Sequence, residues 1–279
     1  MKLVAVSMAR NEEYWIWYSL TSVYPHVDHI LFFDNFSEDR TLAIVKTMAH
    51  IHDKLTIVPG FGASSEQENR ELTLEAARET GATHLLFLDG DEVHVDEDLG
   101  FARRLLEVTD HEPPLHDPPQ NHGEVGNHSP TDGILIKNIG FRPVHPGFAG
   151  PRTSIPADHH YPDNEHSCYN FAIRIASLSN LKGNGKEWGE HGFLESGDLH
   201  IQSSPHTLWC PRLFYFHFRH HPRSPLPRSG RWAANVPALD LGSMAAKEGV
   251  SLPEVLFRPE GPGNPTLEHW GIAPGPSGL

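Results

Sequence analysis

The sequence HLLFLDGDEV, from His84 to Val93, joins an apolar run to a cluster of carboxylates. A short, continuous apolar run of this kind predicts a strand that is buried on both faces, as in the middle of a parallel sheet. In open α/β sheets ligands bind outside the carboxyl ends of the strands, which is where Asp89 and Asp91 are expected. Two aspartates one residue apart can direct oxygens at one divalent cation, such as Mg²⁺ held together with substrate phosphates. A solvated acidic turn that caps the next helix is the alternative for so short a pattern.

Short apolar runs alternate with amphipathic segments over residues 1–95. Strands are expected at residues 3–8, 29–33, 55–58 and from 84 onward, and helices at residues 12–23, 39–50 and 65–80. Ser37 is expected to cap the second helix and Gly81 to end the third. Ser65 and Glu68 form a capping-box pair at the start of the third helix. The alternation predicts an α/β fold with a doubly wound, mostly parallel sheet flanked by helices.

The second half has long irregular connections between its elements. A helix is expected at residues 96–108 and strands at 133–138, 171–177 and 213–218, with irregular stretches at 110–131 and 141–170. The last of these strands places His217 within an apolar and aromatic run. We predict one domain over residues 1–258, followed by a Pro/Gly-rich tail, extended or disordered, over 259–279.

Composition limits the classes of function. The chain has 279 residues and a formal net charge of −14, which makes binding of nucleic acid through bulk electrostatics unfavourable. Two cysteines, Cys168 and Cys210, do not describe a disulfide framework. The N-terminal apolar run is too short for a signal peptide, and no apolar segment approaches the length of a membrane span. The simplest interpretation is a soluble, cytoplasmic protein.

Polar groups follow three of the expected strands, at Arg10–Glu12, Asp34–Asp39 and Asp89–Glu92. Because parallel strands present their carboxyl ends at one edge of a sheet, we expect these groups to meet. Asp34 can accept hydrogen bonds from a base or ribose, and the Asp-x-Asp pair can hold a cation that neutralises a diphosphate. The alternative is that Asp34 and its neighbours only cap the following helix. Neither Gly-x-Gly-x-x-Gly nor a P-loop motif occurs, which disfavours dinucleotide and P-loop sites.

These motifs resemble those of GT-A-fold, nucleotide-sugar-dependent glycosyltransferases of the family-2-like kind. The resemblance rests on Arg10-Asn11-Glu12, on the DNxSxDxT pattern of Asp34–Thr41 and on Asp89-Gly90-Asp91-Glu92. It covers about the first 95 residues, and Phe216-His217-Phe218 with Arg223-Ser224 resembles a late element of the family. It implies a GT-A, Rossmann-like catalytic domain, with a nucleotide-binding half over residues 1–95 and an acceptor-binding half over 96–258.

The resemblance also implies roles for single residues. Asp34 would contact the base or ribose of the donor, Asp89 would hold the ribose or lie near the metal, and Asp91 would bind Mn²⁺ or Mg²⁺ directly. His217 would complete the metal shell, where imidazole suits Mn²⁺ better than Mg²⁺; a core histidine hydrogen-bonded to backbone is the alternative. The implied donor-binding residues are Arg10, Asn11, Glu12, Asp34, Asp89 and Gly90.

The base that takes the proton of the acceptor is expected in KEWGEHGFLESGD, residues 186–198. Glu190 beside Trp188 is the first choice, because an indole face commonly packs against a sugar ring. Trp188 and His191 are then expected to contact the acceptor. A solvated loop carboxylate is the alternative for each candidate, and the sequence has no clear Glu-Asp pair of the sort many inverting relatives carry. The full set of candidate bases is Glu187, Glu190, Glu195 and Asp198.

Three other groups invite simpler explanations. His159, His160 and His166 lack a known zinc-ligand spacing and are expected to be loop histidines. Residues 217–223 form a local basic patch of histidines and arginines that faces either solvent or a diphosphate. The aromatic side chains of Trp15, Trp17 and Tyr18 are expected to pack, not to stack on sugars.

The sequence therefore predicts a metal-dependent glycosyltransferase of the hexosyltransferase type. It would move a sugar, with inversion, from a uridine diphosphate donor to the hydroxyl or amine of a small-molecule or glycan acceptor. The alternatives are a nucleotidyltransferase-like enzyme and a non-catalytic, His-rich metal- or carbohydrate-binding protein. The first alternative normally needs a Gly-rich N-terminal loop and an activating lysine, which the turn at Arg10 lacks.

Overall fold

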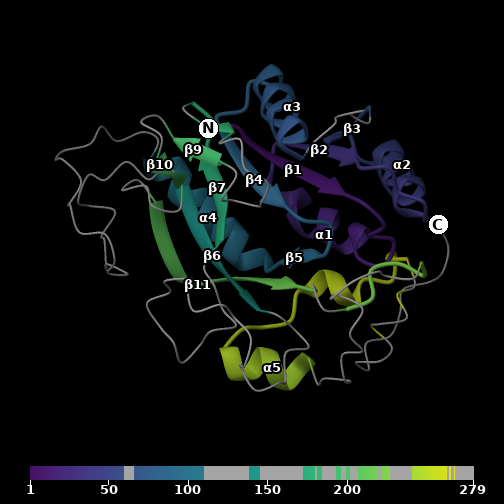
Figure 1. The fold of residues 1–279 in the computed structure, drawn as a ribbon. Coiled ribbons are helices and arrows are strands. Elements are labelled where there is room, and N and C mark those ends of the chain that lie inside the picture. The colour runs from purple at the N-terminus through teal and green to yellow at the C-terminus, as the bar shows by residue number, and fades with distance from the viewer. Residues whose placement is uncertain are drawn as a thin grey trace, which may run out of the picture.

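The computed structural model describes residues 1–59, 66–109, 138–144, 172–179, 181–183, 193–195, 199–201, 207–218, 221–226, 241–262, 264 and 267. Figure 1 shows a central sheet with helices packed around it. The strands are β1 (Leu3–Ala9), β2 (His29–Asp34), β3 (Leu55–Val58), β4 (His84–Leu88), β5 (Glu92–His94), β6 (Asn138–Val144), β7 (Ala172–Ser177), β8 (Lys182–Gly183), β9 (Phe193–Glu195), β10 (Leu199–His200) and β11 (Thr207–His217). The helices are α1 (Ile16–Val23), α2 (Thr41–Ile51), α3 (Glu66–Glu79), α4 (Asp96–Thr109) and α5 (Leu241–Glu248), with 3₁₀ turns η1 (Tyr24–His26) and η6 (Glu254–Phe257). None of these helices has the length and hydropathy that a bilayer crossing needs.

Within the described residues, the main sheet has eight strands in the order β3-β2-β1-β4-β7-β6-β11-β5, and β10-β9-β8 form a second, small sheet. The strands β1 to β4 are parallel, as are β6 and β11, whereas β7 and β5 run antiparallel to their neighbours. The predicted fold class, an α/β, Rossmann-like and mostly parallel sheet flanked by helices, is confirmed. Parallel neighbours need crossover connections, which here are α1, α2 and α3.

Alternate side chains of the parallel strands enter two separate cores. Leu3 and Ala5 of β1 pack with α1, α2 and α4 on one face of the sheet. Val4 and Val6 pack with α3 on the other face. This division follows from the two-residue period of a strand. With both faces covered, the apolar run of β4 is buried as predicted.

Two helices begin later than predicted. α1 begins at Ile16, after a turn at residues 13–15, and the Glu12 carbonyl before this turn accepts the N–H groups of both Trp15 and Ile16 at 2.9 Å. α2 begins at Thr41, and the carboxylate of Asp39 accepts the Thr41 N–H at 2.9 Å. The prediction that Ser37 caps this helix is therefore wrong.

The end of the third predicted helix is confirmed. α3 ends at Glu79, and Gly81 follows with a φ of 75°, a left-handed conformation that glycine adopts without strain. The capping-box prediction concerns Ser65, which lies outside the described residues.

Two strands of the second half have other bounds than predicted. β6 spans Asn138–Val144, so it continues where irregular chain was expected from residue 141, and it shares only Asn138 with the strand predicted at residues 133–138, whose other residues lie outside the described part of the chain. β11 begins at Thr207 instead of residue 213. The register of β11 against β6 shifts between Trp209 and Phe214. Such a shift interrupts the alternation by which a strand is recognised in sequence.

The described part of the predicted tail packs on the segment around α1. Tyr18 Oη donates to the Pro262 carbonyl at 2.8 Å, and Asn264 Nδ2 donates to the Tyr14 carbonyl at 2.6 Å. Leu267 is fully buried. The division into a domain and a tail at residue 258 stays a prediction.

His94 of β5 is a histidine inside the core. Its ring stacks on Tyr215 and meets Phe141 edge-on. Neither ring nitrogen has a hydrogen-bond partner within the described residues. Burial, reinforced by the nearby charge of Arg174, lowers the pKa of His94 to about 3.

The folded protein should therefore lose stability as the pH falls below the ordinary histidine pKa of 6.5. The unfolded chain binds a proton there that folded His94 does not, so each pH unit should cost about 1.4 kcal/mol. Denaturant unfolding at several pH values, on the native chain and on His94→Phe, measures this contribution. The variant should depend less on pH, and equal slopes for the two proteins would contradict the assignment.

Candidate active site

Three parallel strands end at the same edge of the sheet. In the pairing of β1 with β2, Ala9 lies beside Asp34, and in the pairing of β1 with β4, Ser7 lies beside Leu88, the residue before Asp89. Asp34 and Asp89 therefore flank the end of β1 from its two sides. The polar segments after β1, β2 and β4 thus follow neighbouring strands at one edge, as parallel strands require.

The segments after β1 and β2 are hydrogen-bonded to each other. The Asn11 N–H donates to Ser37 Oγ at 3.1 Å, and the Glu38 N–H donates to Asn11 Oδ1 at 2.8 Å. Asn11 and Phe36 both have a φ of 57°. This left-handed conformation is costly for a side chain such as Phe and is commonly retained at functional sites.

Only one of the two carboxylate oxygens of Asp34 accepts a hydrogen bond within the described residues. Its Oδ2 accepts the Ser37 N–H at 3.2 Å, whereas Oδ1 is buried and has no hydrogen-bond partner within the described residues. A buried, unpaired polar atom costs about 1–3 kcal/mol, which a bound donor group would recover. Arg10, by contrast, pairs with Glu38 at 3.0 Å on an exposed surface, where ion pairs contribute little.

The turn from Asp89 to Glu92 is closed by two hydrogen bonds. The Glu92 N–H donates to the Asp89 carbonyl at 3.1 Å, and the Asp89 N–H donates to Glu92 Oε2 at 3.2 Å. Gly90 lies against Glu12, because a Cβ at position 90 would approach Glu12 Cγ to 2.7 Å. The glycine of this motif therefore makes room for the Glu12 side chain.

Asp89, Glu92 and His217 form a group that could hold a metal ion. One possible ligand atom from each lies within 4.8 Å of the others. The antiparallel register of β5 and β11 places Glu92 directly opposite His217, with 3.9 Å between Glu92 Oε1 and His217 Nδ1. Two carboxylates and an imidazole are donors that a divalent metal ion can accept. Sequence reasoning named His217 as a ligand but not Glu92.

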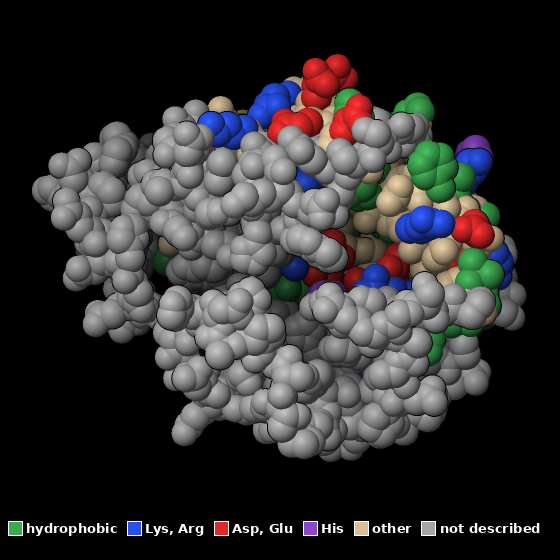
Figure 2. Space-filling model, viewed as in Figure 1, with side chains coloured by type: hydrophobic (Ala, Val, Ile, Leu, Met, Phe, Trp, Pro, Cys, Tyr) green, Lys and Arg blue, Asp and Glu red, His purple; other side chains and the backbone are tan. Residues whose placement is uncertain are grey.

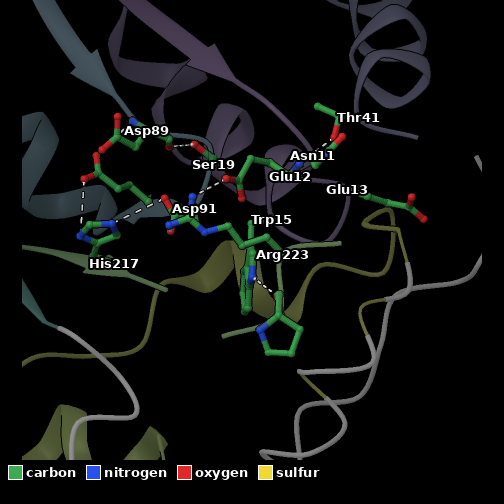
Figure 3. Close-up of polar contacts among 12 residues, drawn as sticks. Asn11, Glu12, Glu13, Trp15, Ser19, Thr41, Asp89, Asp91, His217 and Arg223 are labelled. Atoms are coloured by element: carbon green, nitrogen blue, oxygen red, sulfur yellow. Dashed lines mark hydrogen bonds and ion pairs between the residues drawn. The ribbon is translucent and has the colours of Figure 1, made fainter. Parts of the chain in front are cut away.

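Asp91, the ligand expected from the resemblance, is paired with Arg223. Arg223 lies between two carboxylates (Figure 3), with Nη2 at 2.7 Å from Asp91 Oδ2 and Nη1 at 2.5 Å from Glu12 Oε1. His217 Nε2 is 3.6 Å from Asp91 Oδ1. Burial alone would raise the pKa of the Asp91 carboxyl, but Arg223 and His217 outweigh it and hold that pKa well below its ordinary value. Asp91 is therefore ionised and charge-paired at neutral pH.

The ion pairs with Asp91 and Glu12 also change the pKa of the Arg223 guanidinium. Burial alone would lower the pKa of Arg223, but Asp91 and Glu12 raise it above its ordinary value. Arg223 is therefore a permanent positive charge at this edge, with 23% of its side chain still exposed.

The segment that carries Arg223 is anchored on the residues before α1. Trp15 Nε1 donates to the Pro222 carbonyl at 2.8 Å, and the Tyr14 N–H donates to the Arg223 carbonyl at 2.9 Å. The Trp15 ring stacks on Phe218 with 3.8 Å between ring centroids. The predicted packing role of Trp15, Trp17 and Tyr18 is confirmed, because all three are buried.

Within the described residues, four carboxylates lie around two guanidinium groups. The carboxylates are those of Glu12, Asp89, Asp91 and Glu92, and the guanidinium groups are those of Arg174 and Arg223. This leaves an excess of two negative charges, which a divalent cation would balance. Figure 2 shows acidic, basic and histidine side chains together in a hollow of this face.

The predicted catalytic and acceptor-binding residues are not among those described. Glu190, Trp188 and His191 belong to residues 184–192, and Asp198 belongs to residues 196–198. Their roles stay predictions. The same holds for Glu187, for the side chain of Glu195 in β9, for the histidines at 159, 160 and 166, and for residues 219 and 220 of the basic patch.

Sequence reasoning also missed Arg174. It is the single charged residue of β7, AIRIAS, and a charge within an apolar strand signals a buried ion pair. The signal was present, but the sequence does not say which carboxylate Arg174 meets.

No protein-family model matches this chain, and no curated protein matches its sequence. Among solved structures it is similar to S. aureus TarS, with 17% identity over 78% of this chain and 37% of that one, and a TM-score of 0.42. The mannosyltransferase PcManGT from Pyrobaculum calidifontis, in complex with GDP-Man and Mn²⁺, shares 18% identity over 36% of this chain and 30% of its own, with a TM-score of 0.30.

A third match is mannose-1-phosphate geranyltransferase from Thermus thermophilus, at 19% identity over 44% of each chain and a TM-score of 0.29. The chain spans between 33% and 43% of the length of the TarS structures it matches. At these identities and TM-scores the likenesses do not bear on activity, so function has to be argued from the site residues.

Gly90→Ala should destabilise the protein, because the new Cβ displaces Glu12 from its place against Arg223. We expect a loss of about 1–3 kcal/mol in the free energy of unfolding, measured by denaturant titration. Combining Gly90→Ala with Glu12→Ala removes the obstructing Cγ. The double variant should therefore lose less than the two single variants together, and strictly additive losses would contradict the contact.

Proposed function

We propose that this chain is a metal-dependent glycosyltransferase that transfers a sugar from a nucleoside diphosphate donor to an acceptor hydroxyl or amine. The observation that carries the proposal is the group of Asp89, Glu92 and His217, with the guanidinium of Arg223 close by. A metal site and a fixed arginine at one edge match a diphosphate leaving group, whose negative charge grows as its bond to the sugar breaks.

The donor set fits Mn²⁺ better than Mg²⁺, because one of its three ligands is an imidazole. Asp89 and Glu92 would supply oxygens and His217 a nitrogen. The bound cation would neutralise charge on the diphosphate. Asp91 would serve this site through Arg223, by holding the planar guanidinium in the orientation that contacts phosphate oxygens.

The nucleoside would lie at the ends of β1 and β2. The unpaired Oδ1 of Asp34 suits an N–H or O–H group of a base or ribose. Phe36 is 60% exposed and follows Asp34 closely, so its ring is available to a base. Asn11 and Gly90 would shape this edge, and Arg10 would add positive charge at its rim. We propose a uridine diphosphate sugar as the donor.

The second half of the chain would supply the acceptor side. An inverting hexosyl transfer needs a carboxylate that takes the acceptor proton on the face of the sugar opposite the diphosphate. Glu190 is our first candidate for this base and Asp198 the second, with Trp188 and His191 contacting a small-molecule or glycan acceptor. We propose that residues 1–258 form one catalytic domain that contains both halves.

Uridine diphosphate should stabilise the native chain when Mn²⁺ is present, and Asp89→Asn should lose most of this effect. A ligand that binds only the folded state adds about 2.7 kcal/mol at a concentration one hundred times its Kd. Thermal unfolding with Mn²⁺, Mg²⁺ or no metal, each with and without the nucleotide, measures the coupling. Glu97→Gln on α4, which removes an exposed carboxylate elsewhere, is the matched control and should behave as the native chain.

Equal stabilisation of the native chain and Asp89→Asn would contradict the proposed metal site. Release of uridine diphosphate from a uridine diphosphate sugar in the presence of Mn²⁺ separates the transferase from a binding protein. The absence of release from every nucleotide sugar in a panel, with and without acceptors, would count against the transferase.

A further inference from the structure

A buried ion pair includes Glu92, which with Asp89 and His217 forms the group that could hold a metal ion (the metal-capable group). Arg174 Nη2 of β7 is 2.7 Å from Glu92 Oε1 of β5, and the two side chains are only 6% and 0% exposed. The two strands are not neighbours in the sheet. The pair therefore joins two strands that are not hydrogen-bonded to each other, and it does so in the interior of the protein.

Stability does not explain such a pair. Removing two charges from water costs about as much as their attraction returns, and apolar replacements of similar size are often as stable or more so. The arrangement instead fixes the orientation of the Glu92 carboxylate, because each of its two oxygens has a partner. Arg174 holds Oε1, and the backbone N–H of Asp89, itself a member of the metal-capable group, donates to Oε2 at 3.2 Å.

Arg174 is itself held in one orientation. Its Nη2 donates to Tyr215 Oη at 2.9 Å, and its guanidinium lies over the Tyr215 ring, 4.8 Å from the centroid. Tyr215 is two residues before His217 in β11, so the same strand fixes the arginine and supplies the imidazole. The contacts form a chain from Tyr215 through Arg174 to Glu92, and Glu92 faces His217.

We propose that Arg174 is a positioning residue for the metal site, and that with Tyr215 it aims the Glu92 carboxylate at the cation shared with Asp89 and His217. The proposal rests on the metal site of the proposed function. Arg174 would act through Glu92 and would not itself be a metal ligand. Residues that orient metal ligands in this way typically change metal affinity by about 10- to 100-fold when they are replaced.

The test is the Kd for Mn²⁺ alone, measured from the electron paramagnetic resonance signal of free Mn²⁺, together with the unfolding midpoint of each variant. Arg174→Met, which keeps the length of the side chain, should raise the Kd about 10- to 100-fold. Arg174→Lys keeps the positive charge, so its Kd for Mn²⁺ should lie between those of the native chain and Arg174→Met. Tyr215→Phe keeps the ring and loses only the hydroxyl, so it should raise the Kd by a smaller factor.

Arg103→Met is the matched control. Arg103 also pairs with carboxylates, Asp28 and Glu107, but on a part of the molecule away from the edge. The Arg103→Met variant should have a lower unfolding midpoint and an unchanged Kd for Mn²⁺. Tyr215→Phe keeps the proposal testable if Arg174→Met does not fold.

The outcomes separate this inference from the proposed function. If Glu92→Gln weakens Mn²⁺ binding while Arg174→Met and Tyr215→Phe bind like the native chain, the positioning role is wrong and the metal site stands. If the native chain binds no Mn²⁺, or Glu92→Gln leaves binding unchanged, the metal site itself fails and this inference fails with it.

Discussion

The site depends on the ion pairs that Arg223 makes with Glu12 and Asp91. Glu12 and Asp91 are both buried, and two carboxylates so placed repel each other strongly in a medium of low dielectric constant. The guanidinium between them removes this repulsion and ties together segments that are 211 residues apart in the chain. The stack of Trp15 on Phe218 packs the same two segments together beside the ion pairs.

The sheet explains why the metal-capable group lies beside Arg223. β4 delivers Asp89 to the carboxyl edge, and the turn at Gly90 returns the chain into β5, which pairs antiparallel with the end of β11. That pairing puts His217 opposite Glu92, and the Phe218 N–H donates to the Asp91 carbonyl at 2.8 Å. One short strand pair therefore positions the histidine, two of the carboxylates and the start of the segment that leads to Arg223.

Local patterns predicted the first half of the fold well, because buried strands and amphipathic helices leave their period in the sequence. The meeting of Asp34 and Asp89 at one edge followed from the expectation of parallel strands alone. The start of α2 was misjudged because Ser37 and Asp39 are both good caps, and the Oγ of Ser37 is instead used by the backbone of Asn11. The extent of β11 was misjudged because its register shift hides the alternation.

The partners of the charged side chains could not be predicted in the same way. Asp91 has the same sequence signal as a metal ligand and as a partner of Arg223, and its pairing with Arg223 depends on the docking of residues 221–224 on the start of α1. Its predicted role as a metal ligand stays a prediction. Arg174 stands out in its strand, yet its pairing with Glu92 depends on how distant strands come together. Contacts of this kind are set by packing, which leaves no periodic trace in the sequence.

The most direct test of this account is to locate the cation. Crystals grown with Mn²⁺ and uridine diphosphate, with diffraction recorded above and below the manganese absorption edge, give an anomalous difference map that shows Mn²⁺ alone. We expect one strong peak within bonding distance of Asp89, Glu92 and His217, with Arg223 still between Glu12 and Asp91. A peak bound to other residues, or a nucleotide bound at this edge with no peak beside it, would contradict the account.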